Sequence, residues 1–245
     1  MIKYNSMKLD VLAFAAHPDD VELSCGGTII KLVESGKKVG IIDLTEGELG
    51  SRGSVASRYE EAENASRILG LTIRENLRLR DGFFEINEEN KLKVIEQIRR
   101  FRPEIVLANS ILDRHPDHER ASKLIEDSFF LAGLRKVVTH RDSIEQEAYR
   151  PKVLYNYIQD RYIKPDFVVK LSEQQFQQKM KAVLAYKTQF YNPDSKEPKT
   201  PISGKDFLDF LRGRASEYGR AIGASYGEGF TVSRVVGVDQ LFDLQ

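Results

Sequence analysis

The sequence of 245 residues has one cysteine, no tryptophan and no excess of charge of either sign. A single cysteine, Cys25, cannot form an internal disulfide, which excludes a cross-linked secreted scaffold and suits a reducing compartment. Lys and Arg together number 37, as do Asp and Glu. With zero formal net charge, no global field favours nucleic acid or an anionic membrane. Any attraction for an anionic ligand must therefore be local.

Long apolar stretches are also missing. No apolar run approaches the ~18 residues that a membrane-spanning helix requires. Near the N-terminus, Asp19, Asp20 and Glu22 interrupt the apolar stretch, which does not match the layout of a secretory signal peptide. Together with 41% hydrophobic and 30% charged residues, these absences predict a soluble, cytoplasmic protein with no nucleic-acid or membrane partner. The length suits one large domain with a substantial core.

Short apolar runs alternate with segments of helical pattern. The expected strands are 9–16, 39–45, 76–80, 104–109, 153–158 and 167–171, and the expected helices are 21–34, 56–69, 92–101, 118–131, 172–186 and 207–222. Such alternation predicts right-handed βαβ units and an α/β fold with a mostly parallel sheet. A long loop at 191–205 is of the kind that often borders a site.

Two histidine motifs follow two of these strands. The first, His-Pro-Asp-Asp at 17–20, follows the strand 9–16, and the second, His-Pro-Asp-His at 115–118, follows the strand 104–109. The carboxyl ends of parallel strands share one edge of a sheet, where ligands collect in this architecture. Three of the four histidines of the chain lie in these motifs. We therefore expect the two motifs to form one site.

The residue types in the motifs are those of a catalytic metal site. A catalytic zinc takes three His or carboxylate ligands and keeps a position for water, whose pKa it lowers toward neutrality. His17, Asp20 and His118, the last from the loop before a helix, are the candidate ligands. The same set matches the facial triad of an Fe(II) oxygenase. A lone His-Pro-Asp-Asp also fits a capped turn, but the second motif favours a metal.

The neighbours of these candidate ligands fit acid–base chemistry. Asp19 is placed to take a proton from the attacking water, and His115 to donate to an oxyanion or a leaving amine. Asp117 is a candidate to orient or charge-stabilise His115. Hydrolysis gives both Asp19 and His115 a task, whereas an oxygenase gives them none, so metal-dependent hydrolysis is the favoured interpretation.

The motifs resemble those of the LmbE/PIG-L family of zinc-dependent N-acetylglucosaminyl deacetylases. The matching segments are AHPDDVELSCGGTI at 16–29, DLTEGELGSRG at 43–53 and DRHPDH at 113–118. Three further segments are similar to the branch that acts in bacillithiol biosynthesis, whose members remove acetyl from N-acetylglucosaminyl malate: YNYIQDRYIKPDFVVKLSE at 155–173, AYKTQF at 185–190 and YGEGF at 226–230.

The resemblance implies a Rossmann-like three-layer sandwich in a single LmbE-like deacetylase domain over residues 1–245. The metal site would come from loops at 17–20 and 115–118, and the part from 150 to 245 would complete the sheet and the site rim. Relatives in this branch are often hexameric, which implies a homo-oligomer such as a hexamer.

The resemblance also implies roles for the site residues. One Zn²⁺ per chain would be bound by His17, Asp20 and His118, with Fe²⁺ or another divalent metal as the alternative. Asp19 would be the general base, and His115 would be the electrophilic or acid histidine.

Two arginines are candidates for substrate binding under this interpretation. Arg58 follows the glycine-rich loop, where the branch carries a substrate-binding arginine, and Arg114 directly precedes His115. A malyl aglycone carries two carboxylates, and the planar guanidinium of arginine pairs with carboxylate in a bidentate manner. In a chain without net charge, these two residues would provide the local attraction.

Three functions remain open from the sequence. The first is deacetylation of N-acetylglucosaminyl malate, a small amino-sugar conjugate. The second is deacetylation of chitooligosaccharide or another N-acetylglucosamine conjugate. The third is a non-catalytic sugar- or metal-binding module, against which Asp19 argues, because a pure binder has no use for a second, unligated carboxylate.

Overall fold

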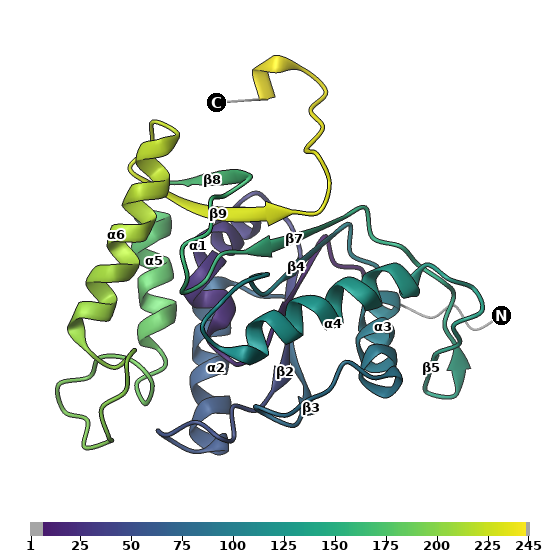
Figure 1. Ribbon diagram of the computed structural model, residues 1–245, viewed down its shortest axis with the longest axis horizontal. Coiled ribbons are helices and arrows are strands. Elements are labelled where there is room, and N and C mark those ends of the chain that lie inside the picture. The colour runs from purple at the N-terminus through teal and green to yellow at the C-terminus, as the bar shows by residue number, and fades with distance from the viewer. Residues whose placement is uncertain (1–6, 244–245) are drawn as a thin grey trace.

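Seven strands form one mixed sheet with helices on both faces in the computed structural model, which describes residues 7–243 (Figure 1). The strands of this sheet are β1 (Val11–Ala15), β2 (Val39–Thr45), β3 (Ile73–Leu79), β4 (Ile105–Ala108), β7 (Val153–Tyr157), β8 (Phe167–Leu171) and β9 (Tyr226–Val232). The helices are α1 (Asp20–Glu34), α2 (Val55–Leu69), α3 (Glu88–Phe101), α4 (Pro116–Ala132), α5 (Glu173–Leu184) and α6 (Lys205–Ala221). A small hairpin of β5 (His140–Arg141) and β6 (Ile144–Glu145) and a 3₁₀ turn at Leu241–Asp243 complete the elements. The ends of the expected domain, residues 1–6 and 244–245, lie outside the described residues.

The sheet has the strand order β3-β2-β1-β4-β7-β9-β8. The first five strands are parallel, and β9 runs antiparallel to both β7 and β8. The predicted α/β class with a mostly parallel sheet is therefore confirmed. From β1 the chain adds β2 and then β3 on one side of β1, and it later returns to place β4 on the other side. The direction in which strands are added therefore reverses between β1 and β4. This is the position where such sheets bind ligands.

Strand β9 was not expected from the sequence, which reads there as a glycine-rich segment. Its glycines have a packing reason. A Cβ at Gly227 would lie 3.1 Å from the backbone nitrogen of Gly219 in α6, and one at Gly229 would lie 3.0 Å from the ring of Tyr218. Glycine permits this close approach of helix to strand but weakens the apolar pattern by which a strand is recognised.

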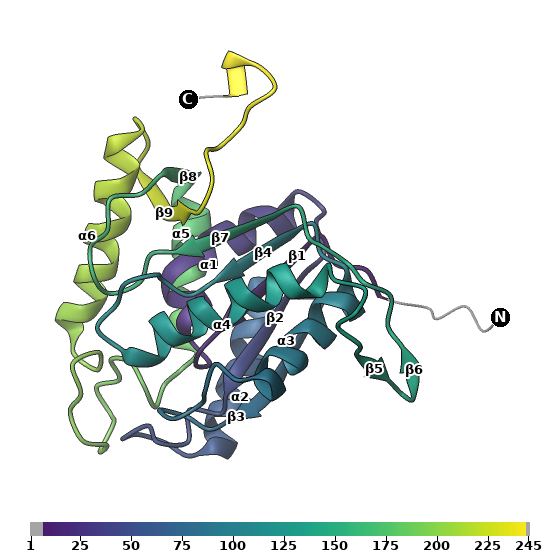
Figure 2. The same cartoon turned by 45° about the vertical axis from the view of Figure 1, so that its right-hand side comes forward.

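Helices cover both faces of the sheet (Figure 2), and the alternation of side chains along β1 divides the core between these faces. Val11 and Ala13 belong to one buried cluster with residues of α1, α2 and α5. Leu12 and Phe14 belong to a second with residues of α3 and α4. Cover on both faces fixes the central strands, and so fixes the loops at their carboxyl ends. Residues 7–243 contain no helix long and apolar enough to cross a membrane.

Helix α1 changes direction at Cys25, whose φ of −133° and ψ of 20° are not helical. The backbone amides of Gly27 and Thr28, just after the break, donate to the carboxylate of Glu228 at 3.0 and 2.6 Å. That buried carboxylate also pairs with Lys179 at 2.6 Å. Glu228 thus caps the second part of the helix, so the first turn can follow a different axis toward the site.

Replacing Gly27 with alanine is expected to destabilise the protein by about 1–3 kcal/mol, because the added methyl group would overpack this junction. Its Cβ would clash with Leu171 and lie 3.1 Å from Glu228 Oε1. Gly213, exposed within α6, is the matched control: a Cβ there meets no atom within 4 Å among the described residues. Gly213→Ala should stabilise by roughly 0.5–1 kcal/mol through helix propensity. Chemical denaturation of both variants tests the pair, and equal effects would contradict the packing argument.

Candidate metal and catalytic site

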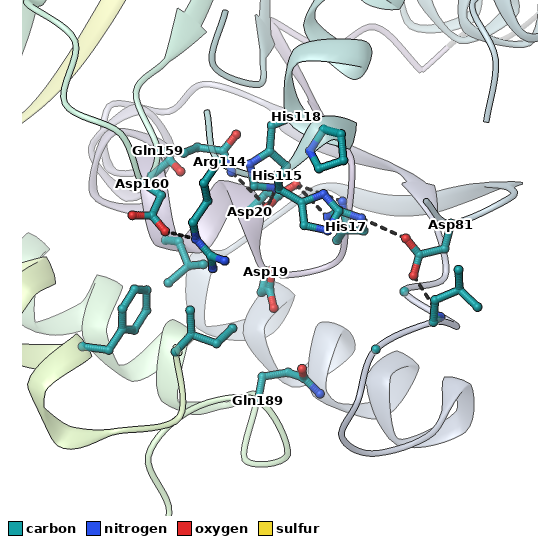
Figure 3. A pocket seen from close by; sticks show the side chains of 18 of the residues that line it. His17, Asp19, Asp20, Asp81, Arg114, His115, His118, Gln159, Asp160 and Gln189 are labelled. Atoms are coloured by element: carbon teal, nitrogen blue, oxygen red, sulfur yellow. Dashed lines mark hydrogen bonds and ion pairs between the residues drawn. The ribbon is translucent and has the colours of Figure 1, made fainter. Parts of the chain in front are cut away.

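A cavity of about 390 Å³ opens at the carboxyl ends of β1 and β4, where the strand order reverses (Figure 3). His17 and Asp19 enter it from the β1–α1 connection. His115 and His118 enter it from the start of α4. The two motifs, about 100 residues apart in the sequence, thus form one site. Asp20 is the first residue of α1 and His118 lies in the first turn of α4, so both side chains project from the helix starts that follow the two loops.

Asp20 lies at the centre of the site and is almost fully buried. Its Oδ2 accepts hydrogen bonds from the backbone amide of His17 and the side chain of Asn109, both at 2.9 Å. Its Oδ1 accepts one from Gln159 at 3.0 Å and lies 3.2 Å from His118 Nε2. Burial alone would raise the pKa of Asp20, but the charges and hydrogen bonds of His118 and His17 hold it well below its usual range. The carboxylate is therefore ionised and fixed in orientation.

His17 presents its two ring nitrogens to different partners. Nδ1 lies 3.7 Å from Asp20 Oδ2, whereas Nε2 lies 3.0 Å from Asp81 Oδ1 and 3.3 Å from Asp117 Oδ2. Two carboxylates at Nε2 favour a proton there, so that in the neutral ring the lone pair of Nδ1 faces Asp20. Burial lowers the pKa of His17, but the bonds to Asp117 and Asp81 and the charge of Asp20 outweigh it and raise the pKa to about 10. The surroundings of His17 thus stabilise positive charge.

His118 repeats this arrangement from the other side of Asp20. Its Nε2 faces Asp20, and its Nδ1 lies 3.1 Å from Asp113 Oδ1, although Nδ1 has no well-aligned hydrogen-bond partner among the described residues. Burial lowers the pKa of His118, but the charge of Asp20 and the contact with Asp113 raise it to about 9. Like His17, this ring is buried among carboxylates.

The donor set fits a divalent metal ion. His17 Nδ1 and His118 Nε2 both face the carboxylate of Asp20, and the other nitrogen of each ring is next to a carboxylate, as is usual for metal-binding histidines. Two imidazoles and one carboxylate suit zinc and other divalent transition metals. Among the described residues, two other groups have ligand atoms that all lie within 4.8 Å of one another: His17, His115 and His118, and His17, Asp81 and Asp117. We favour Asp20 over His115 as the third metal ligand, because His115 Nδ1 already accepts a hydrogen bond from the backbone.

His115 is held by the backbone amide of Asp117, which donates to His115 Nδ1 at 3.3 Å. A neutral His115 ring therefore carries its proton on Nε2. Burial lowers the pKa of His115, and the charges of His17 and His118 lower it further, so the neutral form is favoured. The sequence predicted that Asp117 would orient or charge-stabilise His115. In the structure the carboxylate of Asp117 contacts His17 and not His115, so it does not orient His115 directly. Its backbone amide contacts His115, and its charge opposes the lowering of the His115 pKa.

Asp19 precedes α1 with an unusual backbone conformation, φ 122° and ψ −20°. Within residues 7–243 its carboxylate forms no capping hydrogen bond to the helix. Instead, Asp19 Oδ2 accepts from Arg58 Nη1 at 3.2 Å. Burial raises the pKa of Asp19 to about 7, with Arg58 opposing the shift and Asp20 adding to it. A carboxyl with this pKa can both accept and release a proton near neutrality.

The two candidate arginines both line the cavity but differ in their partners. Arg58 is buried and donates to the carbonyl of Pro18 at 2.9 Å as well as to Asp19. Arg114 lies at the rim, with 45% of its side chain exposed, and forms an ion pair with Asp160 that is visible in Figure 3. Arg114 is thus open to solvent, whereas Arg58 is engaged with the residue beside the metal site.

Sequence reasoning did not single out four residues that surround the candidate ligands. Asp81 contacts His17, Asp113 contacts His118, and both Asn109 and Gln159 donate hydrogen bonds to Asp20. Gln159 follows β7, the neighbour of β4, so the strand-end rule that identified the histidine motifs would also have identified it. Asp81 follows the edge strand β3, whose partly exposed residues gave the sequence only a weak strand pattern.

Asp117→Asn is expected to weaken metal binding about 10–100-fold, as is typical when the carboxylate behind a metal-binding histidine is lost. The side chain of Asp117 is fully buried between His17 and Arg120. Asp127→Asn, on the same helix but paired with Lys91 and Lys123, is the matched control and should bind metal normally. Competition titration with a chelating indicator measures both affinities. An unchanged affinity in Asp117→Asn would exclude this role of Asp117.

Comparison with known proteins gives consistent matches over most of the chain. Residues 12–129 match the family model of PIG-L, described as GlcNAc-PI de-N-acetylase. The diacetylchitobiose deacetylase of Thermococcus kodakarensis is 30% identical over 241 residues, covering 92% of this chain and 83% of that protein. The conserved protein TT1542 of Thermus thermophilus superposes with a TM-score of 0.83 and 38% identity, over 94% of this chain and 98% of the other. The N,N'-diacetylchitobiose deacetylase of Pyrococcus horikoshii, solved with an inhibitor, superposes with a TM-score of 0.76 and 27% identity, over 91% of this chain and 82% of the other.

Proposed function

This chain belongs to the PIG-L family of N-deacetylases, and on that premise we propose that it removes acetyl from an N-acetylglucosamine-containing substrate with a divalent metal ion held by His17, Asp20 and His118. The observation that carries the proposal is the arrangement around Asp20. Two imidazole nitrogens face one ionised carboxylate, and two further groups, Asp19 and His115, line the same cavity.

The ion that we propose is zinc, one per chain. When bound, it would supply Lewis acidity, which polarises the amide carbonyl and lowers the pKa of water. The carboxylates behind His17 and His118 keep the unliganded ring nitrogens protonated and fix the orientation of each ring. Asn109 and Gln159 hold the carboxylate of Asp20 in place.

Asp19 transfers the proton, and His115 stabilises the charge that forms on the carbonyl oxygen. Asp19 takes the proton of the attacking water as the water oxygen bonds to the acetyl carbon. The neutral His115 ring, with its proton on Nε2, donates a hydrogen bond to the oxyanion that forms on the carbonyl oxygen. The carbon–nitrogen bond then breaks, the amine takes the proton that Asp19 accepted from the water, and the acetic acid formed loses its proton to solvent to become acetate. His115 can replace Asp19 as the acid only in its protonated form.

Two substrates are proposed within this class. The first is an N-acetylglucosamine oligomer such as diacetylchitobiose, because two similar proteins are named for that activity. The second is N-acetylglucosaminyl malate, because two guanidinium groups, those of Arg114 and Arg214, line the rim and share one residue, Asp160. The Asp160 carboxylate pairs with Arg114, whereas Arg214 donates to the backbone carbonyl of Asp160, so among the described residues no ion pair holds the Arg214 guanidinium and it can bind a carboxylate aglycone.

Amine release from zinc-loaded protein tests the proposal. N,N'-diacetylchitobiose, N-acetylglucosaminyl malate and free N-acetylglucosamine are compared side by side at equal concentration. Preference for the malate conjugate, lost in Arg114→Ala, would support the second substrate, and preference for the oligomer would support the first. If the zinc-loaded protein released no amine from any of the three, the chain would be a non-catalytic module and the proposed function would be wrong.

A further inference from the structure

The backbone at Asp19 is held in a conformation that a side chain with a Cβ rarely adopts. Its φ of 122° lies in the region that favours glycine. The usual compensation for an aspartate at the start of a helix is a hydrogen bond to the free amides of the first turn. Within the described residues, the carboxylate of Asp19 makes no such bond. Another group must therefore hold this carboxylate where the reaction needs it.

Arg58 is the group in contact with both parts of this turn. Its Nη1 donates to the carbonyl oxygen of Pro18 at 2.9 Å and to Asp19 Oδ2 at 3.2 Å. One nitrogen thus joins the backbone just before Asp19 to the carboxylate of Asp19 itself. The side chains of Arg58 and Asp19 are each only 8% exposed. Ion pairs exposed to solvent contribute little to stability, but this pair is shielded from solvent.

The surrounding chain holds Arg58 in this position. It lies in the first turn of α2, which begins with a capping box between Ser54 and Ser57. The guanidinium lies against the glycine-rich loop, where a Cβ at Gly47 or Gly50 would be only 3.4 Å from its nitrogens. A Cβ at that distance would be in van der Waals contact with the guanidinium, so the loop packs directly against Arg58. The loop and helix therefore direct Arg58 at the turn before α1.

We infer that Arg58 is a positioning residue for the general base, holding the Asp19 carboxylate toward the attacking water by joining it to the Pro18 carbonyl. The inference rests on the proposed function, since it takes Asp19 to be the base. It differs from the role of binding a substrate carboxylate. A substrate-binding arginine would affect the KM of an anionic substrate, whereas a positioning arginine affects kcat for neutral and anionic substrates alike.

Arg58→Ala and Arg58→Lys test the inference, with Arg67→Ala as the matched control. Arg67 is on the same helix, is exposed, and pairs with Glu63. In Arg58→Ala we expect kcat to fall about 100-fold, the effect of misplacing a catalytic group by about 1 Å. KM and zinc content should stay near the wild-type values. Arg58→Lys, or guanidinium ion added to Arg58→Ala, should restore part of the rate, because either can donate to Asp19. Arg67→Ala should match the wild type.

Two results would overturn the inference. One is an unchanged kcat in Arg58→Ala with a raised KM for an anionic substrate. The other is a crystal structure of Arg58→Ala in which the Asp19 carboxylate keeps its position and its φ. The crystal structure decides even if the wild-type protein releases no amine, an outcome that would refute the proposed function separately.

Discussion

Asp19→Asn is expected to leave the protein folded and metal-loaded while lowering kcat about 10²–10⁴-fold, the usual contribution of a general base. Asparagine has the shape of aspartate and tolerates positive φ better than most residues, so the turn before α1 should survive. It can still accept a hydrogen bond from Arg58 through its amide oxygen. What it cannot do is take a proton from water. Steady-state amine release, together with metal analysis of the same sample, measures both parts of this expectation.

The control for this variant is Asp209→Asn on the exposed side of α6, which removes a carboxylate from the same domain without touching the base. It should match the wild type in both rate and metal content. Full activity in Asp19→Asn would assign the base elsewhere in the cavity. Loss of metal from Asp19→Asn would instead mean that Asp19 is itself a ligand.

His118→Ala is expected to abolish stoichiometric metal binding, whereas His115→Ala is expected to retain the metal and lose most of the rate. His118 Nε2 faces Asp20, while His115 Nδ1 accepts a hydrogen bond from the Asp117 amide. Removing His118 leaves two of the three protein ligands that a catalytic zinc takes. Removing His115 takes away the oxyanion donor, a loss worth roughly 10²–10³ in kcat at comparable sites.

Elemental analysis of the two purified variants after identical zinc loading and dialysis separates the two roles. One zinc per chain in His118→Ala would exclude His118 from the ligand set. Zinc missing from His115→Ala would favour the alternative group of three histidines. His115 is the N-cap of α4 and His118 lies in the first turn of the same helix, so each variant is a structural control for the other.

The parts of this molecule that follow from local pattern were predictable from the sequence. The buried runs at β1 and β4 indicated parallel strands, and the rule that ligands collect at their carboxyl ends brought together His17 and His118 across about 100 residues. That rule depends only on strand direction and order, which short apolar runs with helical crossovers specify well.

The parts that depend on contacts between distant segments were not predictable. The Asp117 side chain was assigned to its neighbour His115, but the helix that it helps to begin turns its carboxylate toward His17. Asp81 is 64 residues from His17, and no periodicity links the two. Strand β9 was missed because the close approach of α6 requires glycine where a strand pattern would show apolar residues. In each case tertiary packing decides what local sequence leaves open.

The most direct test of the account is a zinc titration of metal-free wild-type protein, with amine release from diacetylchitobiose and from N-acetylglucosaminyl malate measured at each addition. We expect activity on at least one substrate to rise linearly with added zinc and to reach a plateau at one ion per chain. His118→Ala, titrated in parallel, should remain inactive. Full activity in the metal-free protein, or a plateau reached by His118→Ala at the same ratio, would contradict a catalytic metal held by His17, Asp20 and His118.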